Sequence, residues 1–375
     1  MNIPFNYKEL QDIMRAGAID LAVASSRHNV RYLLGSYYYH FHERSTRMAR
    51  SRYLPFVGIP ASGADGAFYV HRPDEEGQIG ITGLWVPHFV GAPRGTLSSA
   101  AALVGHLRGM GLEKARIGLE MPFLPADAFL ALRKELPEAD FVDATPVFEA
   151  LRARKGPAEI AVMRSAYAAL AEAIHESFLA SAEGDTTQEI AKRVEVKAAE
   201  RGLSFLFALV CAGPGFLRAP SAARWERGRI LHIDAGASDR DYIADICRMG
   251  CIGKPSPLAA ELHKACIRVQ DETRAMVRPG LPCKDLFAAG ERASKSYPFS
   301  RYSRFVVHGI GMVPYERPIF SPPGDEVLEE GMVLSIETDF IHPEVGHVKI
   351  EDAVAVTADG HEGLGDSGRD WTILE

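Results

Sequence analysis

Residues 230–250 read ILHIDAGASDRDYIADICRMG, and they carry acidic side chains in segments that otherwise look buried. Ile230, Leu231 and Ile233 predict a buried strand that runs directly into Asp234. A second predicted strand, 242–247, carries Asp245 in its middle. Burying a charge costs several kcal/mol unless something neutralises it. Either a cation lies between the two carboxylates or the strand assignment is wrong.

The bulk composition is that of an ordinary globular protein, with 375 residues, 47% hydrophobic and 24% charged, and a net charge of −7. This charge gives no reason to expect nucleic-acid binding. No apolar run approaches the roughly 18 residues that a membrane helix needs, and the first residues lack the apolar core of a signal peptide. Five cysteines, an odd number, do not suggest a disulfide scaffold. We therefore expect a cytoplasmic protein with neither nucleic acid nor membrane as a partner.

The pattern of apolar residues changes near residue 150, and a chain of this length exceeds one usual core. Before that point strands and helices alternate, although residues 18–41 predict only a strand, a turn and an aromatic-rich segment. After it, Pro157 predicts the first turn of a long helix, and Thr186 with Glu189 predicts a capping box. Helices are also predicted over 256–280 and 281–296, and strands over 303–356. We predict an α/β protein with two domains, 1–152 and 153–375.

Three further stretches place polar groups among apolar neighbours. FVVHGIG (305–311) carries His308, MVLSIETDF (332–340) carries Glu337, and VKIEDAVAV (348–356) carries Glu351. Each of these residues alone is more readily explained as solvated or paired with an arginine. Together with Asp234 and Asp245, in this order, they are hard to explain in that way.

Neutralisation is the physical reason to read these residues as a metal site. Four carboxylates facing one core repel one another by several kcal/mol. Two divalent cations such as Mn²⁺, Fe²⁺, Co²⁺ or Zn²⁺ would resolve this, since oxygen-rich sites suit such ions. Two ions about 3.5–4 Å apart can share a bridging hydroxide and polarise a carbonyl. The pattern thus predicts a dinuclear metal-dependent hydrolase.

These motifs resemble those of the pita-bread family that contains aminopeptidase P, prolidase, methionine aminopeptidase and creatinase. IDAGASDRDYIADICR, HGIG, SIETD and VKIEDAVAVT match the ordered motifs of that family, as do the separations of 11 between Asp234 and Asp245 and of 14 between Glu337 and Glu351. HNVRYLLG and LRARKGPAEI resemble its creatinase-type N-terminal domain and the entry to its catalytic domain. The resemblance implies an α+β pita-bread catalytic domain, an α/β creatinase-like N-terminal domain and a homodimer.

The resemblance also implies a role for each residue of the set. The expected metal ligands are Asp234, Asp245, His308, Glu337 and Glu351. Glu337 and His308 are also expected to act in catalysis, with Glu337 moving the proton.

The departures from the family pattern lie in the groups that handle substrate. Tyr315 stands where peptidases of the family carry a second histidine, and Leu217 stands where they carry another. Lys349 replaces an arginine, which keeps the charge but loses the bidentate fork, and Cys247 replaces a threonine. A tyrosine can hydrogen-bond an oxyanion but is a poor proton shuttle at neutral pH. We predict that Tyr315 acts in catalysis and that Tyr315, Arg218 and Lys349 bind substrate.

Three functions follow from this pattern. The first is a hydrolase resembling Xaa-Pro dipeptidase or aminopeptidase P, which cleaves a dipeptide-like or small amide substrate through a metal-bridging hydroxide. The second is a non-peptidase relative, a small-molecule C–N hydrolase or C–S lyase, as in creatinase, ectoine hydrolase or dimethylsulfoniopropionate lyase. The third, an inactive binding module, is disfavoured because all five expected ligands are present.

Residues 37–53, YYYHFHERSTRMARSRY, combine aromatic rings with four arginines. The simpler interpretation is a surface segment with ordinary charges. In creatinase-like dimers, however, the N-terminal domain can cap the active site of the partner, and this segment would then supply anion-binding groups.

Overall fold

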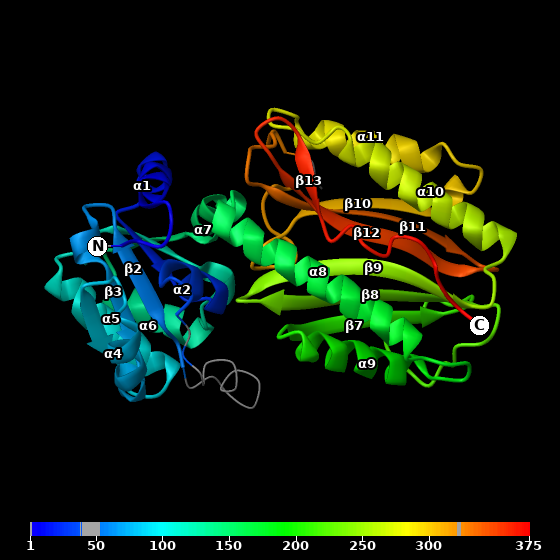
Figure 1. The fold of residues 1–375 in the computed structure, drawn as a ribbon. Helices are drawn as coiled ribbons and strands as arrows, with labels where there is room; N and C mark the ends of the chain where they lie inside the picture. The colour runs from blue at the N-terminus through cyan, green and yellow to red at the C-terminus, as the bar shows by residue number, and fades with distance from the viewer. Residues whose placement is uncertain (1, 38, 40–52, 321–323) are drawn as a thin grey trace. The chain divides into compact units, whose positions relative to one another are not determined.

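The computed structural model describes residues 2–37, 39, 53–320 and 324–375, which belong to two compact units, Met1–Leu151 and Arg152–Glu375 (Figure 1). Most of the predicted anion-binding segment 37–53 lies outside these residues. No helix in the described ranges is both long and apolar enough to cross a membrane.

The first unit is built on a six-stranded mixed sheet with the order β4-β3-β2-β1-β5-β6. Its strands are β1 (Leu21–Ala24), β2 (Phe56–Pro60), β3 (Phe68–His71), β4 (His88–Gly91), β5 (Arg116–Leu119) and β6 (Asp140–Asp143). Its helices are α1 (Tyr7–Ala16), α2 (Arg27–Leu33), α4 (Glu76–Thr82), α5 (Thr96–Gly109), α6 (Ala126–Glu135) and α7 (Thr145–Ala153), with short 3₁₀ turns at Ala64–Gly66, Pro73–Glu75 and Met121–Phe123. Alternate residues of β1 join two separate apolar clusters, so the sheet is covered on both faces.

The turn that the sequence predicts after β1 is wrong, because residues 27–33 form α2. Ser26 caps this helix by accepting the amide of Asn29. The buried Glu120, just after β5, accepts the amides of Ser25 and Ser26 at 2.5 and 2.8 Å and the Asn29 side chain at 2.6 Å. A carboxylate more than 90 residues away thus satisfies the start of the helix, which local patterns cannot reveal.

The second unit is built on an eight-stranded sheet with the order β10-β11-β12-β9-β8-β7, to which β13 adds on β12 and β14 on β9. Its strands are β7 (Ser204–Ala212), β8 (Ile230–Asp239), β9 (Tyr242–Ile252), β10 (Ser303–Gly309), β11 (Val333–His342), β12 (Gly346–Val356), β13 (His361–Leu364) and β14 (Thr372–Leu374). Neighbouring strands are antiparallel except β14, which runs parallel to β9.

Four helices pack on this sheet: α8 (Pro157–Leu179) along β8 and β9, α9 (Thr187–Glu200) on β7, α10 (Pro257–Arg274) on β11 and β12, and α11 (Cys283–Lys295) on β10 (Figure 1). The Pro157 start and the Thr186–Glu189 capping box are confirmed. Val307, Ile336 and Val354 face the apolar core on the helical side. Because side chains alternate along a strand, His308, Glu337 and Glu351 point to the other face.

Candidate metal centre

Strand register brings the expected ligands together. Asp234 lies opposite Cys247, Cys247 pairs with Glu351, and Glu351 pairs with Glu337. Residues directly opposite one another in antiparallel strands point to the same face. One row across four strands therefore carries three carboxylates.

The remaining groups lie two residues along their strands from that row. Asp245 and Lys349 stand two residues before Cys247 and Glu351, and His308 lies opposite Ser335, two residues before Glu337. Side chains two residues apart share a face, so these groups point to the same side as the row.

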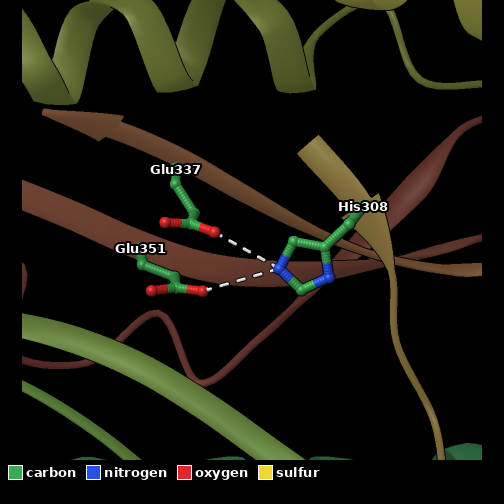
Figure 2. A group of neighbouring side chains, drawn as sticks. All are labelled: His308, Glu337 and Glu351. Atoms are coloured by element: carbon green, nitrogen blue, oxygen red, sulfur yellow. Dashed lines mark ion pairs between the residues drawn. The ribbon is translucent and has the colours of Figure 1, made fainter. Parts of the chain in front are cut away.

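His308, Glu337 and Glu351, from β10, β11 and β12, form the first of two overlapping groups of metal-binding type (Figure 2). His308 Nε2 lies 3.3 Å from Glu337 Oε1 and 4.0 Å from Glu351 Oε1. Ser335 donates to the same Glu351 oxygen at 2.8 Å. All three residues of the group are buried.

Asp234, Asp245 and Glu351 form the second group, and one ligand atom from each lies within 4.8 Å of the others. Glu351 belongs to both groups. A shared carboxylate between two sets of donors is the arrangement that can hold two neighbouring ions.

The electrostatics of the site fit a divalent cation. Burial, with neighbouring carboxylates, raises the pKa of Asp245 well above its usual range and the pKa of Glu351 to about 7. Asp245 Oδ1 and His308 Nε2 are buried without a hydrogen-bond partner among the described residues. The four carboxylates of the centre thus outnumber the cations that contact them, and a hard or borderline metal ion would satisfy the two buried atoms that have no partner.

A loop that folds back over the end of β10 supports His308. Gly309 donates to the Pro318 carbonyl at 3.2 Å and accepts the Glu316 amide at 3.1 Å. A Cβ on Gly309 would run into the backbone of Glu316 and Arg317. The glycine after His308 is required by this close approach.

The same loop is tied to the start of the unit by a buried ion cluster. Glu316 Oε1 lies 2.7 Å from Lys155 Nζ, and Glu316 Oε2 lies 3.1 Å from Arg152 Nη2. All three side chains are almost fully buried. These contacts fix the residue that directly follows Tyr315.

Tyr315, which the sequence analysis predicts to act in catalysis, lies beside His308. Its ring stacks on the His308 imidazole at 4.1 Å between centroids, while 68% of the residue stays exposed. Desolvation and the carboxylates of Glu337 and Glu351 raise the pKa of its phenol, so the hydroxyl stays protonated and can donate.

Lys349 and Arg218, the other expected substrate residues, both contact a carboxylate of the centre. Lys349 Nζ lies 2.7 Å from Asp234 Oδ2 and 2.6 Å from both Glu337 Oε2 and Glu351 Oε2. Arg218 Nη1 donates to Asp234 Oδ2 at 3.3 Å, and a third of its side chain is exposed.

Sequence reasoning missed a second polar row beside the centre. His232 and His347 rings lie 4.3 Å apart, His347 Nε2 lies 3.1 Å from Asp339 Oδ2, and Arg304 pairs with the same oxygen. Burial and nearby cations keep the pKa of His232 far below its usual range. The spacing along the strands could have revealed this row. His232 and His347 stand two residues before Asp234 and Lys349, and side chains two residues apart on a strand share a face.

Two family descriptions match this chain. Residues 161–358 match metallopeptidase family M24, and residues 7–154 match the creatinase/prolidase N-terminal domain. The first match spans more than half of the chain and contains all five expected ligands. The chain belongs to metallopeptidase family M24. As a member of this family it is a metal-dependent hydrolase, and the family expected from the motifs is confirmed.

Relatives of this chain include a Xaa-Pro dipeptidase of Pyrococcus horikoshii, 27% identical over 66% of this chain and 72% of its own. An uncharacterized Bacillus subtilis peptidase, YqhT, is 23% identical over 98% of this chain and 99% of its own.

Among solved structures, a Pyrococcus horikoshii dipeptidase superposes with a TM-score of 0.84 at 22% identity, covering 98% of this chain and 99% of its own. A Bacillus anthracis Xaa-Pro dipeptidase gives 0.82 at 20% identity, covering 98% of both chains. These likenesses confirm the expected pita-bread fold with a creatinase-like N-terminal domain.

Proposed function

We propose that this M24 hydrolase cleaves a dipeptide-like or other small amide substrate with two divalent ions held by Asp234, Asp245, His308, Glu337 and Glu351. The observation that carries the proposal is the sharing of Glu351 by two groups of donors. One carboxylate in both groups keeps the two positions adjacent, as a two-ion hydrolytic site requires.

The chemistry divides between the ions and the chain. Two bound ions would supply an activated water and polarise the carbonyl of the scissile bond. Glu337 accepts the proton of the attacking water and returns it to the leaving nitrogen. Burial alone raises the pKa of Glu337, but Lys349 and His308 outweigh it and hold that pKa well below its usual range. Glu337 is therefore ionised, as a proton acceptor must be.

Two groups at the margin of the centre would position the substrate. The protonated Tyr315 hydroxyl can donate to the carbonyl oxygen as negative charge develops there. The exposed part of Arg218 can pair with a substrate carboxylate while the guanidinium keeps its contact with Asp234. A free carboxylate beside the scissile bond is a property of dipeptides.

Xaa-Pro dipeptides are the first substrates to test, since two relatives are named Xaa-Pro dipeptidases. Substitutions near the centre favour a second candidate function, cleavage of a small non-peptide C–N or C–S bond. Its supporting observation is that Tyr315 and Leu217 stand where the resemblance implies histidines.

The test is a substrate panel with the full chain loaded with Mn²⁺, Co²⁺ or Zn²⁺. We expect turnover of Xaa-Pro dipeptides or of a small amide, and its loss in Glu337→Gln. The exposed Glu330 provides the matched control, because Glu330→Gln should keep full activity. Normal turnover by Glu337→Gln would contradict the role assigned to Glu337.

Three further expectations belong to this proposal. Domain limits at 1–152 and 153–375 separate the N-terminal from the catalytic domain. A homodimer is the expected assembly. A cytoplasmic location is also expected, because all five cysteines are buried and unpaired, as is usual in a reducing compartment.

A further inference from the structure

The eight-stranded sheet consists of two halves that meet where β9 lies beside β12 (Figure 1). β8 pairs with β9, and β11 with β12, over ten successive residues each. In the described part of the chain, by contrast, β9 and β12 pair at Cys247 and Glu351 alone. Regular strand pairing thus fixes the junction between the halves at a single point.

The expected metal ligands are divided between these two halves. Asp234 and Asp245 lie on β8 and β9, whereas His308, Glu337 and Glu351 lie on β10, β11 and β12. The group of Asp234, Asp245 and Glu351 takes donors from both halves. The geometry of this group therefore depends on how the junction is held.

Arg248 spans the junction from the face opposite the centre. Side chains alternate along a strand, so Arg248 points away from the side to which Cys247 points. Its Nη1 donates to the carbonyl of Cys247 at 2.8 Å and to the carbonyl of Glu351 at 3.1 Å. One nitrogen thus binds the backbone of both halves at the pair where they meet, and one of its two acceptors belongs to the residue that both groups of donors share.

The other nitrogens of Arg248 hold the guanidinium in place. Nη2 donates to Asp352 Oδ1 at 2.5 Å and to the Gly365 carbonyl at 2.8 Å, and Nε donates to the Ser367 carbonyl at 2.9 Å. A guanidinium has five N–H donors in a fixed fork, and these contacts match all five. The side chain is only 3% exposed, so any shift of the guanidinium would leave buried donors without partners.

We propose that Arg248 is a positioning residue that sets the separation between the two halves of the ligand set. It acts through the backbone of Cys247 and Glu351 and contacts neither substrate nor metal. A lysine at this position keeps the charge but loses the fork that reaches both carbonyls. This inference rests on the proposed function for the identity of the ligands.

The test is Arg248→Lys in the full chain loaded with Mn²⁺, with bound metal counted by elemental mass spectrometry. We expect kcat on the best substrate of the panel to fall by about 10²-fold with little change in KM, because the reacting groups are misplaced while the substrate-binding groups are retained. Electron paramagnetic resonance reports on the ions directly, since two Mn²⁺ ions that share a bridging ligand couple magnetically. We expect coupled ions in the wild-type chain and the signal of separated ions in Arg248→Lys.

Arg274 provides the matched control, because it is a buried arginine that holds the same loop from α10. Its Nη2 donates to both carboxylate oxygens of Asp366, at 2.9 and 2.7 Å, between the two loop residues that Arg248 binds. Arg274→Lys should lower the melting temperature but keep kcat and the coupled Mn²⁺ signal. The comparison separates a general loss of stability from a displaced ligand set.

A second variant carries the test if Arg248→Lys does not fold. Asp352→Asn removes the carboxylate charge that holds Nη2 and should lower kcat by about tenfold, again with little change in KM. Wild-type kcat and coupled ions in both Arg248→Lys and Asp352→Asn, or equal losses in Arg248→Lys and Arg274→Lys, would overturn this inference alone. A wild-type chain with neither turnover nor bound Mn²⁺ would overturn the proposed function along with it.

Discussion

Tyr315 stands where the family resemblance implies a histidine, while the five expected metal ligands are all retained. Its ring stacks on the His308 imidazole and so restricts the movement of that ring. A histidine there could take up and release a proton at neutral pH, whereas a phenol that stays protonated can form hydrogen bonds but does not transfer its proton.

Removing only the hydroxyl separates these two roles. Tyr315→Phe keeps the stack and should lower kcat by about 10²-fold with little change in KM, as loss of one oxyanion donor does. Steady-state kinetics on the best substrate of the panel provide the measurement, with Tyr302→Phe as a tyrosine control outside the centre. Unchanged kinetics would make Tyr315 a structural residue.

The candidate ligand residues stand out in the sequence, because a carboxylate inside an apolar strand is unusual wherever the strand packs, and their role as ligands stays a prediction. The contacts of Lys349 could not be predicted from the sequence. Its charge is visible in the sequence, but its position depends on which oxygens of Glu337 and Glu351 remain free of His308. Its role in substrate binding stays a prediction.

Among the elements, the loop that follows β10 depends on one buried carboxylate. Glu316 lies between Arg152 and Lys155 and holds the loop that carries Tyr315. Breaking a buried ion pair by removing one partner typically costs 3–5 kcal/mol, because charge is left uncompensated.

Glu316→Gln should therefore lower the free energy of unfolding by about 3 kcal/mol. Guanidinium unfolding gives the value. The exposed Arg154–Glu329 pair is the control, since Glu329→Gln should cost less than about 1 kcal/mol. Equal costs for the two variants would show that the buried cluster does not stabilise the unit.

Helix α10 carries a histidine that makes stability depend on pH. Burial, partly offset by Asp370, lowers the pKa of His263 to about 4, and its ring lies 4.8 Å from that of Trp371. Below pH 6.5 the unfolded chain takes up a proton on this residue that the folded chain refuses until about pH 4. The contribution of His263 to stability is thus present at neutral pH and lost as pH falls through this window.

His263→Phe removes this dependence. Between pH 7.5 and 4.5 it should lose about 2–3 kcal/mol less stability than the wild-type chain. Guanidinium unfolding followed by tryptophan fluorescence measures both, with the exposed His88 replaced by Gln as control. Parallel pH profiles for the wild-type chain and His263→Phe would refute the effect.

Local patterns predicted most of the elements of the second unit, because Pro157, the Thr186 capping box and the apolar periods act within a few residues. They failed at α2, where Glu120 satisfies the helix start from far along the chain. They also missed the row of His232 and His347, because only strand register shows that it lies beside the centre.

On the scale of the whole molecule, the two sheets differ in what lies on their faces. The six-stranded sheet of the first unit is covered on both faces, whereas the sheet of the second unit leaves one face for the charged residues of the centre. Neither strand order nor register can be read from a single sequence. This arrangement was predicted from the resemblance to the family, and that resemblance rests on the motif residues.

The measurement that tests the central claim most directly is the metal content of the full chain, after chelator treatment and saturation with Mn²⁺, Co²⁺ or Zn²⁺. We expect about two ions per chain, and less than one in Glu351→Gln, because Glu351 belongs to both groups of donors. Glu330→Gln should keep both ions. A wild-type chain that stays free of metal under all three conditions would contradict the account.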